Sequence, residues 1–203
     1  MGKGPRYHVA FKRRMKAKTD YRMRRSMILS KVPRLVTRGS LKHITAQLVE
    51  AHPEGDKTLV AAHSKELTKD FDWNAPCGNT PTAYLTGFLL GHRGLSLGTQ
   101  HVILDIGLQK PSVGSRVFAV LKGVEDAGLN VLCDKEVLPN ESRVRGEHIA
   151  AYAKQLVEAN PELYEKKFSK YLSKGLKPER LAEHFDQVKN KIVDVFKRDG
   201  KNG

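Results

Sequence analysis

The feature that most restricts the fold of this chain is the uneven distribution of its charge. The first 45 residues hold 14 of the 36 Lys and Arg residues but only one of the 22 acidic residues, Asp20. Mutual repulsion at that density prevents such a segment from forming a core of its own. The other 158 residues carry a net charge of only +1, so the sequence predicts a nearly neutral folded body with a cationic arm.

The position of this charge indicates a polyanionic partner for the arm. Tyr7, Phe11 and Tyr21 lie among arginines, and aromatic rings and guanidinium groups stack on unpaired bases, which favours RNA. A membrane-surface helix would need a broad apolar face, which Val9, Phe11 and Met15 do not supply. A transit peptide would be richer in serine. A disordered, solubilising tail remains an alternative.

The composition of the whole chain excludes several other classes. With 39% hydrophobic residues, the chain can form one domain with a core plus extensions. No apolar run reaches the roughly 18 residues of a membrane span, and no signal-like apolar segment follows the start. Two cysteines, Cys77 and Cys133, are too few for a disulfide scaffold and suggest a reducing, cytosolic setting.

In the arm, residues 1–18 are expected to stay extended or irregular until they bind a partner. Thr19 or Asp20 can then cap a short helix that ends before Pro33. Met23 and Met27 would form a thin apolar stripe that docks on the body while arginines on the other faces meet phosphate.

The body shows the alternating patterns of an α/β fold. Short strands at 35–36, 44–49 and 58–64, with turns at 37–40 and 52–57, predict an antiparallel meander. A capped helix at 80–97 that buries Leu95, a strand at 101–107, a helix at 115–128 and a weak strand at 130–134 follow. The order predicts a mixed sheet covered by helices.

Beyond Pro139, three segments show helical periodicity, at 148–158, 161–172 and 178–196. The last segment carries an apolar stripe that is expected to pack against the body or a neighbour. The reason is that the part beyond Pro139, about 60 residues, would be marginal as an independent domain. The stripe consists of Leu181, Phe185, Val188, Ile192 and Val195. The sequence thus predicts three parts: a basic arm at 1–31, an α/β core at 32–140 and a helical extension at 141–203.

No pattern for catalysis, a cofactor or a metal emerges, so we expect a protein that is not an enzyme. There is no phosphate-binding glycine-rich loop and no nucleophile elbow, and the histidines lack metal-ligand spacing. Asp105, at the end of an apolar run, could hold Mg²⁺ in a nuclease, but metal-assisted cleavage usually needs several converging carboxylates. We interpret Asp105 as a capping or hydrogen-bonding residue. A metal-dependent nuclease on structured RNA and an adaptor for acidic proteins remain alternatives.

Several long blocks carry a family resemblance: "GPRYHVAFKRRMKAKTDYRMR", "PRLVTRGSLKHITAQLV", "TLVAAHSKEL", "APCGNTPTAYLTGFLLG" and "LDIGLQKPSVGSRVFAVLKGVEDAGL". Together they closely resemble the archaeal form of the large-subunit ribosomal proteins of the eighteenth family, over roughly residues 4–150. The part from about residue 150 resembles the helical extension of the archaeal and eukaryotic type.

The resemblance implies a cytoplasmic structural protein of the large ribosomal subunit with ribonuclease-H-like topology and no nuclease activity. It implies that the protein binds 5S rRNA and attaches it to the 23S-type rRNA in the central protuberance. The fifth-family large-subunit protein would be a neighbour there.

Carried over residue by residue, the family's RNA-contacting arm falls on Gly4, Pro5, Arg6, Tyr7, Lys12, Arg13, Arg14, Lys16, Thr19, Tyr21, Arg22 and Arg25. A second signature falls on Arg38, Ser40, Lys42, His43, Ile44, Ala46 and Gln47, with Gly39 where the family can have a polar residue. Arg34, just before this signature, joins the predicted RNA-binding set. Cations would contact phosphates, tyrosines would stack or wedge, and Ser40 and His43 would donate to phosphate or ribose.

Overall fold

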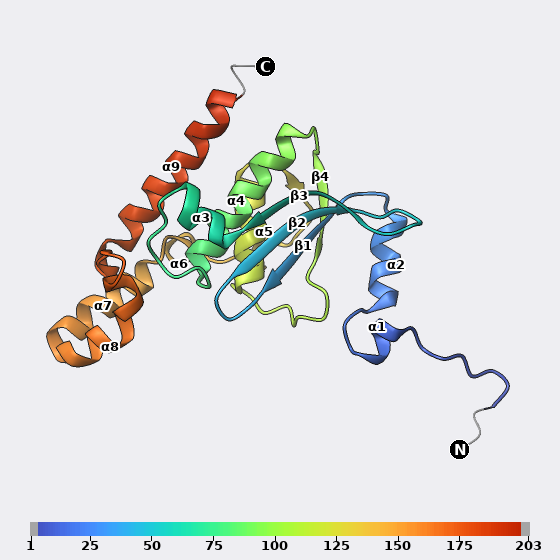
Figure 1. Ribbon diagram of the computed structural model, residues 1–203, viewed down its shortest axis with the longest axis horizontal. Helices are drawn as coiled ribbons and strands as arrows, with labels where there is room; N and C mark the ends of the chain where they lie inside the picture. The colour runs from blue at the N-terminus through green and yellow to red at the C-terminus, as the bar shows by residue number, and fades with distance from the viewer. Residues whose placement is uncertain (1–3, 200–203) are drawn as a thin grey trace.

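The computed structural model describes residues 4–199, and Figure 1 shows their arrangement. Residues 1–3 of the predicted arm and 200–203 of the predicted extension lie outside this range. Within the described residues, the five strands are β1 Arg34–Gly39, β2 Ile44–Glu50, β3 Lys57–His63, β4 His101–Asp105 and β5 Asn130–Val131. The α-helices are α1 Lys12–Met15, α2 Tyr21–Leu29, α3 Ser64–Asp70, α4 Thr80–Ser96, α5 Arg116–Asp126, α6 Glu141–Arg145, α7 Glu147–Ala159, α8 Pro161–Leu172 and α9 Leu181–Asp199. Two short 3-10 helices, η1 Lys135–Val137 and η2 Pro178–Arg180, complete the set.

The strands form one mixed sheet in the order β3-β2-β1-β4-β5. β1, β2 and β3 pair in antiparallel fashion, whereas β4 runs parallel to both β1 and β5. The predicted meander and the α/β class are therefore confirmed. This strand order agrees with the ribonuclease-H-like topology that the resemblance implies.

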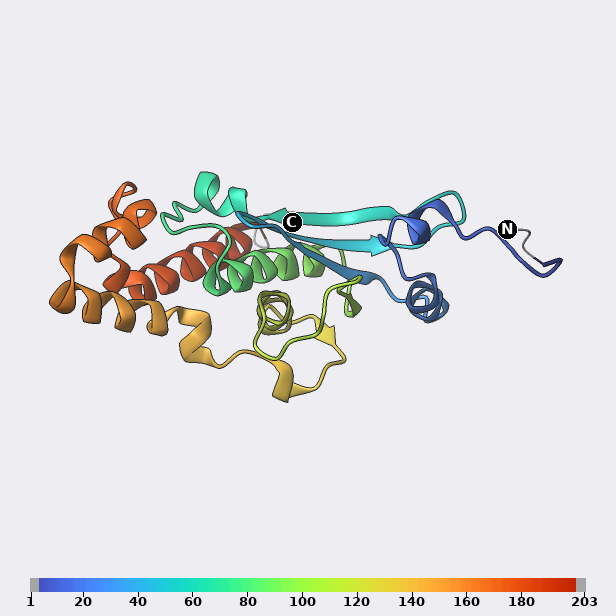
Figure 2. The same ribbon diagram turned by 90° about the horizontal axis from the view of Figure 1, so that it is seen from below.

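Helices cover one face of the sheet. Ile44, Ala46 and Leu48 alternate along β2 as buried residues and belong to the same core cluster as the buried faces of α4 and α5. Figure 2 shows α4, α5 and α9 on one side of β1, β2 and β3. The opposite face of the sheet is left for the arm.

The close packing of α4 on α5 depends on glycine. A Cβ atom at Gly87 would lie 2.1 Å from the Val120 carbonyl oxygen, and one at Gly123 would lie 2.2 Å from the Tyr84 carbonyl oxygen. Such contacts are far inside van der Waals distance, so the two helix backbones can touch only because both positions lack a side chain.

The C-terminal helix is part of the core. Leu181, Phe185, Val188 and Ile192 of α9 are at most 2% exposed and join the cluster formed by the sheet, α4 and α5. The expected packing of this stripe on the body is confirmed for these four residues. Val195 was expected in the stripe, but it is 42% exposed. The buried face continues instead at Phe196, four residues after Ile192, which packs against the core.

Other local predictions were wrong. Residues 37–39 continue β1, and the turn to β2 is closed by Ser40 and His43. Leu95 is 38% exposed rather than buried. Helices α3 and α6 had no counterpart in the sequence prediction. Residues 12–15 form a helical turn, α1, in a segment expected to be extended.

Candidate RNA interface

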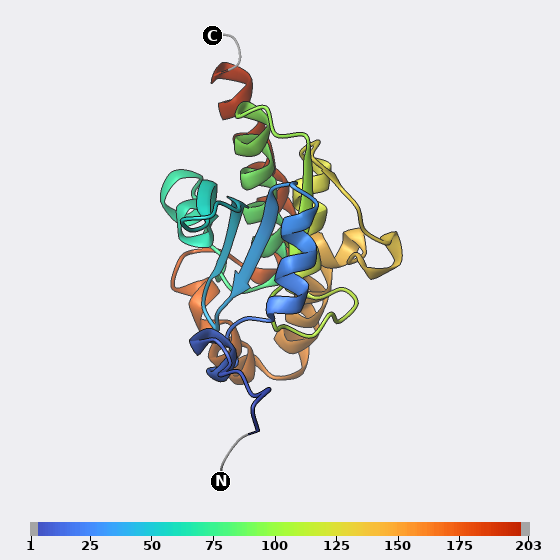
Figure 3. The ribbon, with the colours of Figure 1, turned by 90° about the vertical axis from the view of Figure 1, so that its right-hand side faces the viewer.

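The arm occupies one end of the molecule, and α7 and α8 occupy the other (Figure 1). Viewed from the arm end, α2 stands in front of the strands with α1 below it (Figure 3). The Asp20 carboxylate caps α2 by accepting from the backbone N–H groups of Arg22 and Met23, as the sequence predicts. Neither α1 nor α2 has a buried residue. Burial of apolar surface therefore contributes little to holding the arm in position.

Most of the cations predicted to bind RNA are exposed. The side chains of Arg6, Lys12, Arg13, Arg14, Lys16, Arg22 and Arg25 all face solvent. Within residues 4–199, Arg13 donates to the Thr19 hydroxyl at 2.9 Å, and the side chains of the other six make no hydrogen bond or ion pair. Exposed, unpaired cations are free to contact phosphate without first breaking an internal contact.

Both arm tyrosines lie among these cations. Tyr7 is 48% exposed. The Tyr21 ring is half-buried and lies 4.8 Å from the Phe11 ring, centroid to centroid. Phe11 itself is 69% exposed, so the Phe11–Tyr21 pair presents aromatic surface beside the cations. Such a surface suits stacking on unpaired bases.

A chain of ion pairs links α2 to the sheet. Arg24 donates to both carboxylate oxygens of Asp56, at 2.7 and 2.6 Å. Arg34 donates to Asp56 and to Asp105, each at 2.7 Å, and Arg38 contacts Asp105 at 3.3 Å. Hydrogen bonds, from Arg24 above all and also from Arg34, lower the pKa of Asp56 below its usual value. The five residues therefore form a charged network across the base of the arm.

This network gives Arg34 a position different from that expected of an RNA contact. Arg34 is 3% exposed, and both ends of its guanidinium group are bound to carboxylates. Replacing these internal partners with phosphate would require breaking both ion pairs of a buried guanidinium group. Arg38 is only partly engaged: its side chain is 48% exposed, so it stays available at the surface.

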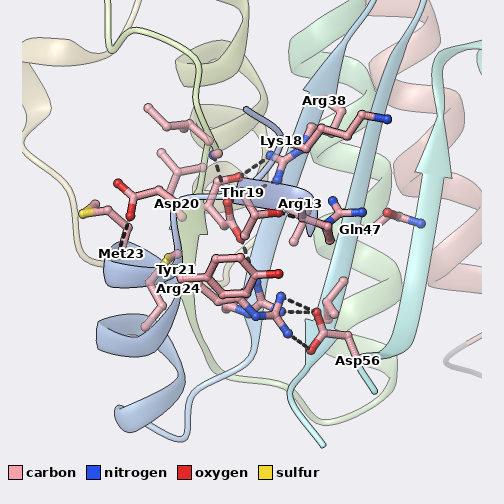
Figure 4. Close-up of a pocket in the computed structure, with 18 of the residues that line it drawn as sticks. Arg13, Lys18, Thr19, Asp20, Tyr21, Met23, Arg24, Arg38, Gln47 and Asp56 are labelled. Atoms are coloured by element: carbon pink, nitrogen blue, oxygen red, sulfur yellow. Dashed lines mark hydrogen bonds and ion pairs between the residues drawn. The ribbon is translucent and has the colours of Figure 1, made fainter. Parts of the chain in front are cut away.

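The arm and the sheet enclose a pocket of about 610 Å³ on the face opposite α4 (Figure 4). Arg13, Lys18 and Arg38 lie at its rim, and Tyr21 projects into it from α2. Val36, Val49 and Leu104 contribute apolar surface, and Gln47 contributes an amide. The pocket combines cations, one aromatic ring and a hydrogen-bonding amide, which are the groups that hold an unpaired nucleotide.

The β1–β2 turn carries the other predicted contacts. Lys42 is exposed. The Ser40 hydroxyl donates to the His43 carbonyl oxygen and accepts from the His43 N–H, so its first role is to close the turn. The His43 ring lies 3.2 Å from the Ser64 hydroxyl. Burial, and then the nearby His63 and Lys65, lower the pKa of His43, so it adds no charge at neutral pH.

Asp105 behaves as the hydrogen-bonding residue predicted from the sequence. Its side chain accepts from Arg34, from Arg38 and from the Gly107 N–H. In residues 4–199, no group of three or more His, Cys, Asp or Glu side chains is placed to hold a metal ion. Likewise, no described helix is long and apolar enough to span a membrane.

Sequence reasoning missed Lys18 and Asp56. It also expected Arg24 to meet phosphate with the other arginines of its helix, whereas the Arg24 guanidinium group pairs with Asp56. Lys18 belongs to the same basic segment as the predicted contacts, so charge density alone could have included it. Asp56 lies 32 residues from Arg24 and 22 from Arg34, and no local pattern connects them. Only the folded sheet brings the carboxylate to the base of the arm.

An α/β body that presents exposed cations and aromatic rings at one end has the arrangement of an RNA-binding protein. The chain belongs to the family described as "Ribosomal large subunit proteins 60S L5, and 50S L18", which matches residues 5–101 and 96–134. The resemblance noted in the sequence is thereby confirmed.

Two archaeal relatives extend the match over nearly the whole chain. The "Large ribosomal subunit protein uL18" of Staphylothermus marinus is 51% identical over 197 residues, which is 97% of this chain and 98% of the relative. The protein of the same name from Caldivirga maquilingensis is 50% identical over 196 residues, covering 97% and 95%. By its family, the chain is a structural protein of the large subunit of the cytoplasmic ribosome.

Proposed function

We propose that this protein binds 5S rRNA through its arm and attaches it to the 23S-type rRNA in the central protuberance. The observation that carries the proposal is the concentration of exposed cations, together with aromatic rings, at one end of an otherwise nearly neutral molecule. As further proposals, the fifth-family large-subunit protein is a neighbour, and the protein needs no metal or cofactor and catalyses no reaction.

The contacts fall into three groups by what the side chains can do. Exposed cations neutralise phosphates along the RNA backbone; they are Arg6, Lys12, Arg13, Arg14, Lys16, Arg22, Arg25, Arg38 and Lys42. Tyr7 and Tyr21 stack on or wedge between bases. Ser40 and His43 shape the β1–β2 turn and offer hydrogen bonds at its surface. Arg34 does not contact RNA in this proposal. It holds Asp56 in place as part of the ion-pair network.

Recognition by these groups depends mainly on RNA shape. Contacts to phosphate carry little information about base identity, so specificity comes from the fold of the RNA and a few unstacked bases. If about eight cations each neutralise one phosphate, the slope of log K against log salt is about −6 to −7.

A filter-binding titration with 5S rRNA at several salt concentrations tests the proposal. The full chain should bind with a steep negative salt slope, and a variant that lacks residues 1–25 should lose binding. Its sheet and α4 should still fold, because no side chain of α1 or α2 is buried. Full affinity in the truncated protein would rule out the arm as the main RNA contact. Mg²⁺-dependent RNA cleavage abolished by Asp105→Ala would instead revive the nuclease alternative.

A further inference from the structure

The charged network contains a carboxylate where a protein that binds RNA would be expected to avoid one. Asp56 lies in the β2–β3 turn, next to α2 and the pocket. Its side chain is 27% exposed, and a negative charge near phosphate opposes RNA binding. Its presence at this end of the molecule therefore needs a reason.

The reason lies in how α2 is held. Within residues 4–199, the only side-chain hydrogen bonds from α2 to the sheet and its turns are those between Arg24 and Asp56. An isolated helix shorter than about 12 to 15 residues is marginal in water, and α2 has nine. Losing the Arg24–Asp56 contact would thus free the position of α2 and also weaken the helix.

Asp56 is itself fixed by the body. Arg34, which is 3% exposed, donates to it at 2.7 Å and is anchored in turn by Asp105 on β4. A carboxylate held in this way presents two oxygens to the guanidinium group of Arg24, and such two-point pairs are both strong and directional. The position of Arg24 on α2 is therefore fixed by three side chains of the body, which are Asp105, Arg34 and Asp56.

We propose that Asp56 is a positioning residue for RNA binding. It docks Arg24, and with it α2, before the RNA arrives, so that Arg22, Arg25 and Tyr21 are already displayed in their binding arrangement. The proposal rests on the proposed function, that the arm binds 5S rRNA. Its physical basis is conformational. If only a fraction of the molecules hold α2 in the binding arrangement, the apparent affinity for RNA falls in proportion to that fraction.

The test compares two substitutions that change the net charge equally. Asp56→Asn and Glu54→Gln each remove one negative charge from the β2–β3 turn. The exposed Glu54 side chain makes no hydrogen bond or ion pair with another described residue. Charge alone predicts that both variants bind 5S rRNA slightly more tightly than the wild type. Positioning predicts that Asp56→Asn binds about fivefold to tenfold more weakly, with an unchanged salt slope, while Glu54→Gln does not weaken binding.

Amide hydrogen exchange of the free proteins supplies a second readout. Asp56→Asn should exchange faster within α2 than the wild type, whereas Glu54→Gln should not, and the sheet should exchange alike in all three proteins. If Asp56→Asn binds as tightly as Glu54→Gln, the positioning role is wrong even though RNA binding stands. If the wild type itself shows no salt-dependent affinity for 5S rRNA, the proposed function fails instead.

A second pair of variants covers the case in which Asp56→Asn does not fold. Arg24→Gln leaves Asp56 paired with Arg34, whereas Arg22→Gln removes an exposed cation from the same helix. Arg22→Gln should reduce the salt slope by about 0.7 to 0.9, as expected for one lost phosphate contact. Arg24→Gln should weaken binding at least as much while leaving the slope unchanged. Equal changes of slope in the two variants would identify Arg24 as an ordinary phosphate contact and overturn the proposal.

Discussion

At the residue scale, exposure separates the cations that can reach RNA from those that support the fold. Arg14 is exposed, and its side chain makes no hydrogen bond or ion pair with another described residue, whereas Arg34 is held between two carboxylates. Two arginines from one basic stretch of sequence thus have different roles. Removing the Arg14 side chain should weaken RNA binding without changing the stability of the fold.

We expect Arg14→Ala to weaken 5S rRNA binding by about 1 kcal/mol and to reduce the salt slope by about 0.7 to 0.9, because one phosphate contact among many is lost. Filter binding across a salt series measures both quantities. Lys174→Ala is the control, because Lys174 is an exposed cation next to α8, at the opposite end of the molecule. Equal effects of the two substitutions would contradict an interface confined to the arm end.

His184 makes the stability of the protein dependent on pH. Its Nε2 atom accepts from the Asn74 N–H at 3.1 Å, and its ring stacks on buried Trp73 at 5.1 Å. Burial, and then the neighbouring Lys191, lower the pKa of His184 below 6.5. The unfolded chain therefore takes up a proton first, so this stabilisation is complete above pH 6.5 and is lost as pH falls towards the folded pKa.

Thermal unfolding at about pH 7.5 and about pH 5 measures this effect. The wild type should lose more stability on acidification than His184→Gln, which has no titrating ring at this position. His101→Gln, at an exposed position of β4, should behave like the wild type. An equal loss of stability in the wild type and in His184→Gln would show that other groups cause the dependence.

The sequence predicted single-residue roles where they depend on local geometry. Asp20 was one of the two residues expected to cap the helix, with Thr19 as the other, and Asp105 was expected to be a capping or hydrogen-bonding residue rather than a catalytic one. The position of Arg34 could not be predicted, since its partners lie 22 and 71 residues away in the chain. Strand periodicity places Arg34, Val36 and Arg38 on one face, but it does not say which carboxylates the fold brings to that face.

At the scale of the element, the pair α4 and α5 determines how tightly the helical layer packs. Gly87→Ala would place a methyl group 2.1 Å from the Val120 carbonyl oxygen, so the two helices must move apart. We expect the free energy of unfolding to fall by about 3 kcal/mol, at the upper end of the usual cost of overpacking. Urea denaturation measures this change.

Gly39→Ala is a suitable control for that substitution. A Cβ atom at Gly39 would meet only the end of the Arg116 side chain, at 3.7 Å, which is an ordinary contact. Its free energy of unfolding should stay within about 0.5 kcal/mol of the wild type, as for most surface substitutions. Similar losses in the two variants would show that the helix crossing is not the cause.

Elements with a sustained period were predicted well, and short elements were not. The stripes of α5 and α9 repeat over several turns, so their helical period is clear in the sequence. α3 has seven residues, and its N-cap is His63, which accepts from the Lys65 N–H. Histidine is not among the preferred capping residues, so no signal marked the start of this helix. The β1–β2 turn was misplaced because Gly39, a residue typical of turns, ends the strand.

At the scale of the whole molecule, the C-terminal extension and the α/β core share one hydrophobic cluster. The sequence predicted a division at residues 31 and 140, and this division stays a prediction about organisation. The structure adds that Trp73 of the body stacks on His184 of α9, and that Lys191 pairs with Asp72 at 2.7 Å. Periodicity revealed the apolar stripe of α9 but could not identify the surface that it covers.

This shared core predicts that the protein unfolds as one unit and fails to fold without α9. Burying a large apolar side chain contributes about 1.5 to 3 kcal/mol, so the four buried residues of α9 contribute about 6 to 12 kcal/mol. That is comparable with the whole stability of a typical domain, about 5 to 15 kcal/mol. A variant truncated after Lys177 should therefore show no cooperative thermal transition, whereas the variant lacking residues 1–25 should retain one.

Two point substitutions make the same test without shortening the chain. Ile192 is fully buried, and Val195, one turn further along α9, is 42% exposed. Ile192→Ala should lower the free energy of unfolding by about 2 to 5 kcal/mol, the usual cost of such a deletion in a core, and should do so for the whole protein. Val195→Ala should cost far less. If Ile192→Ala melted α9 alone and left the sheet at its original transition, the extension would be an accessory to the core and not part of it.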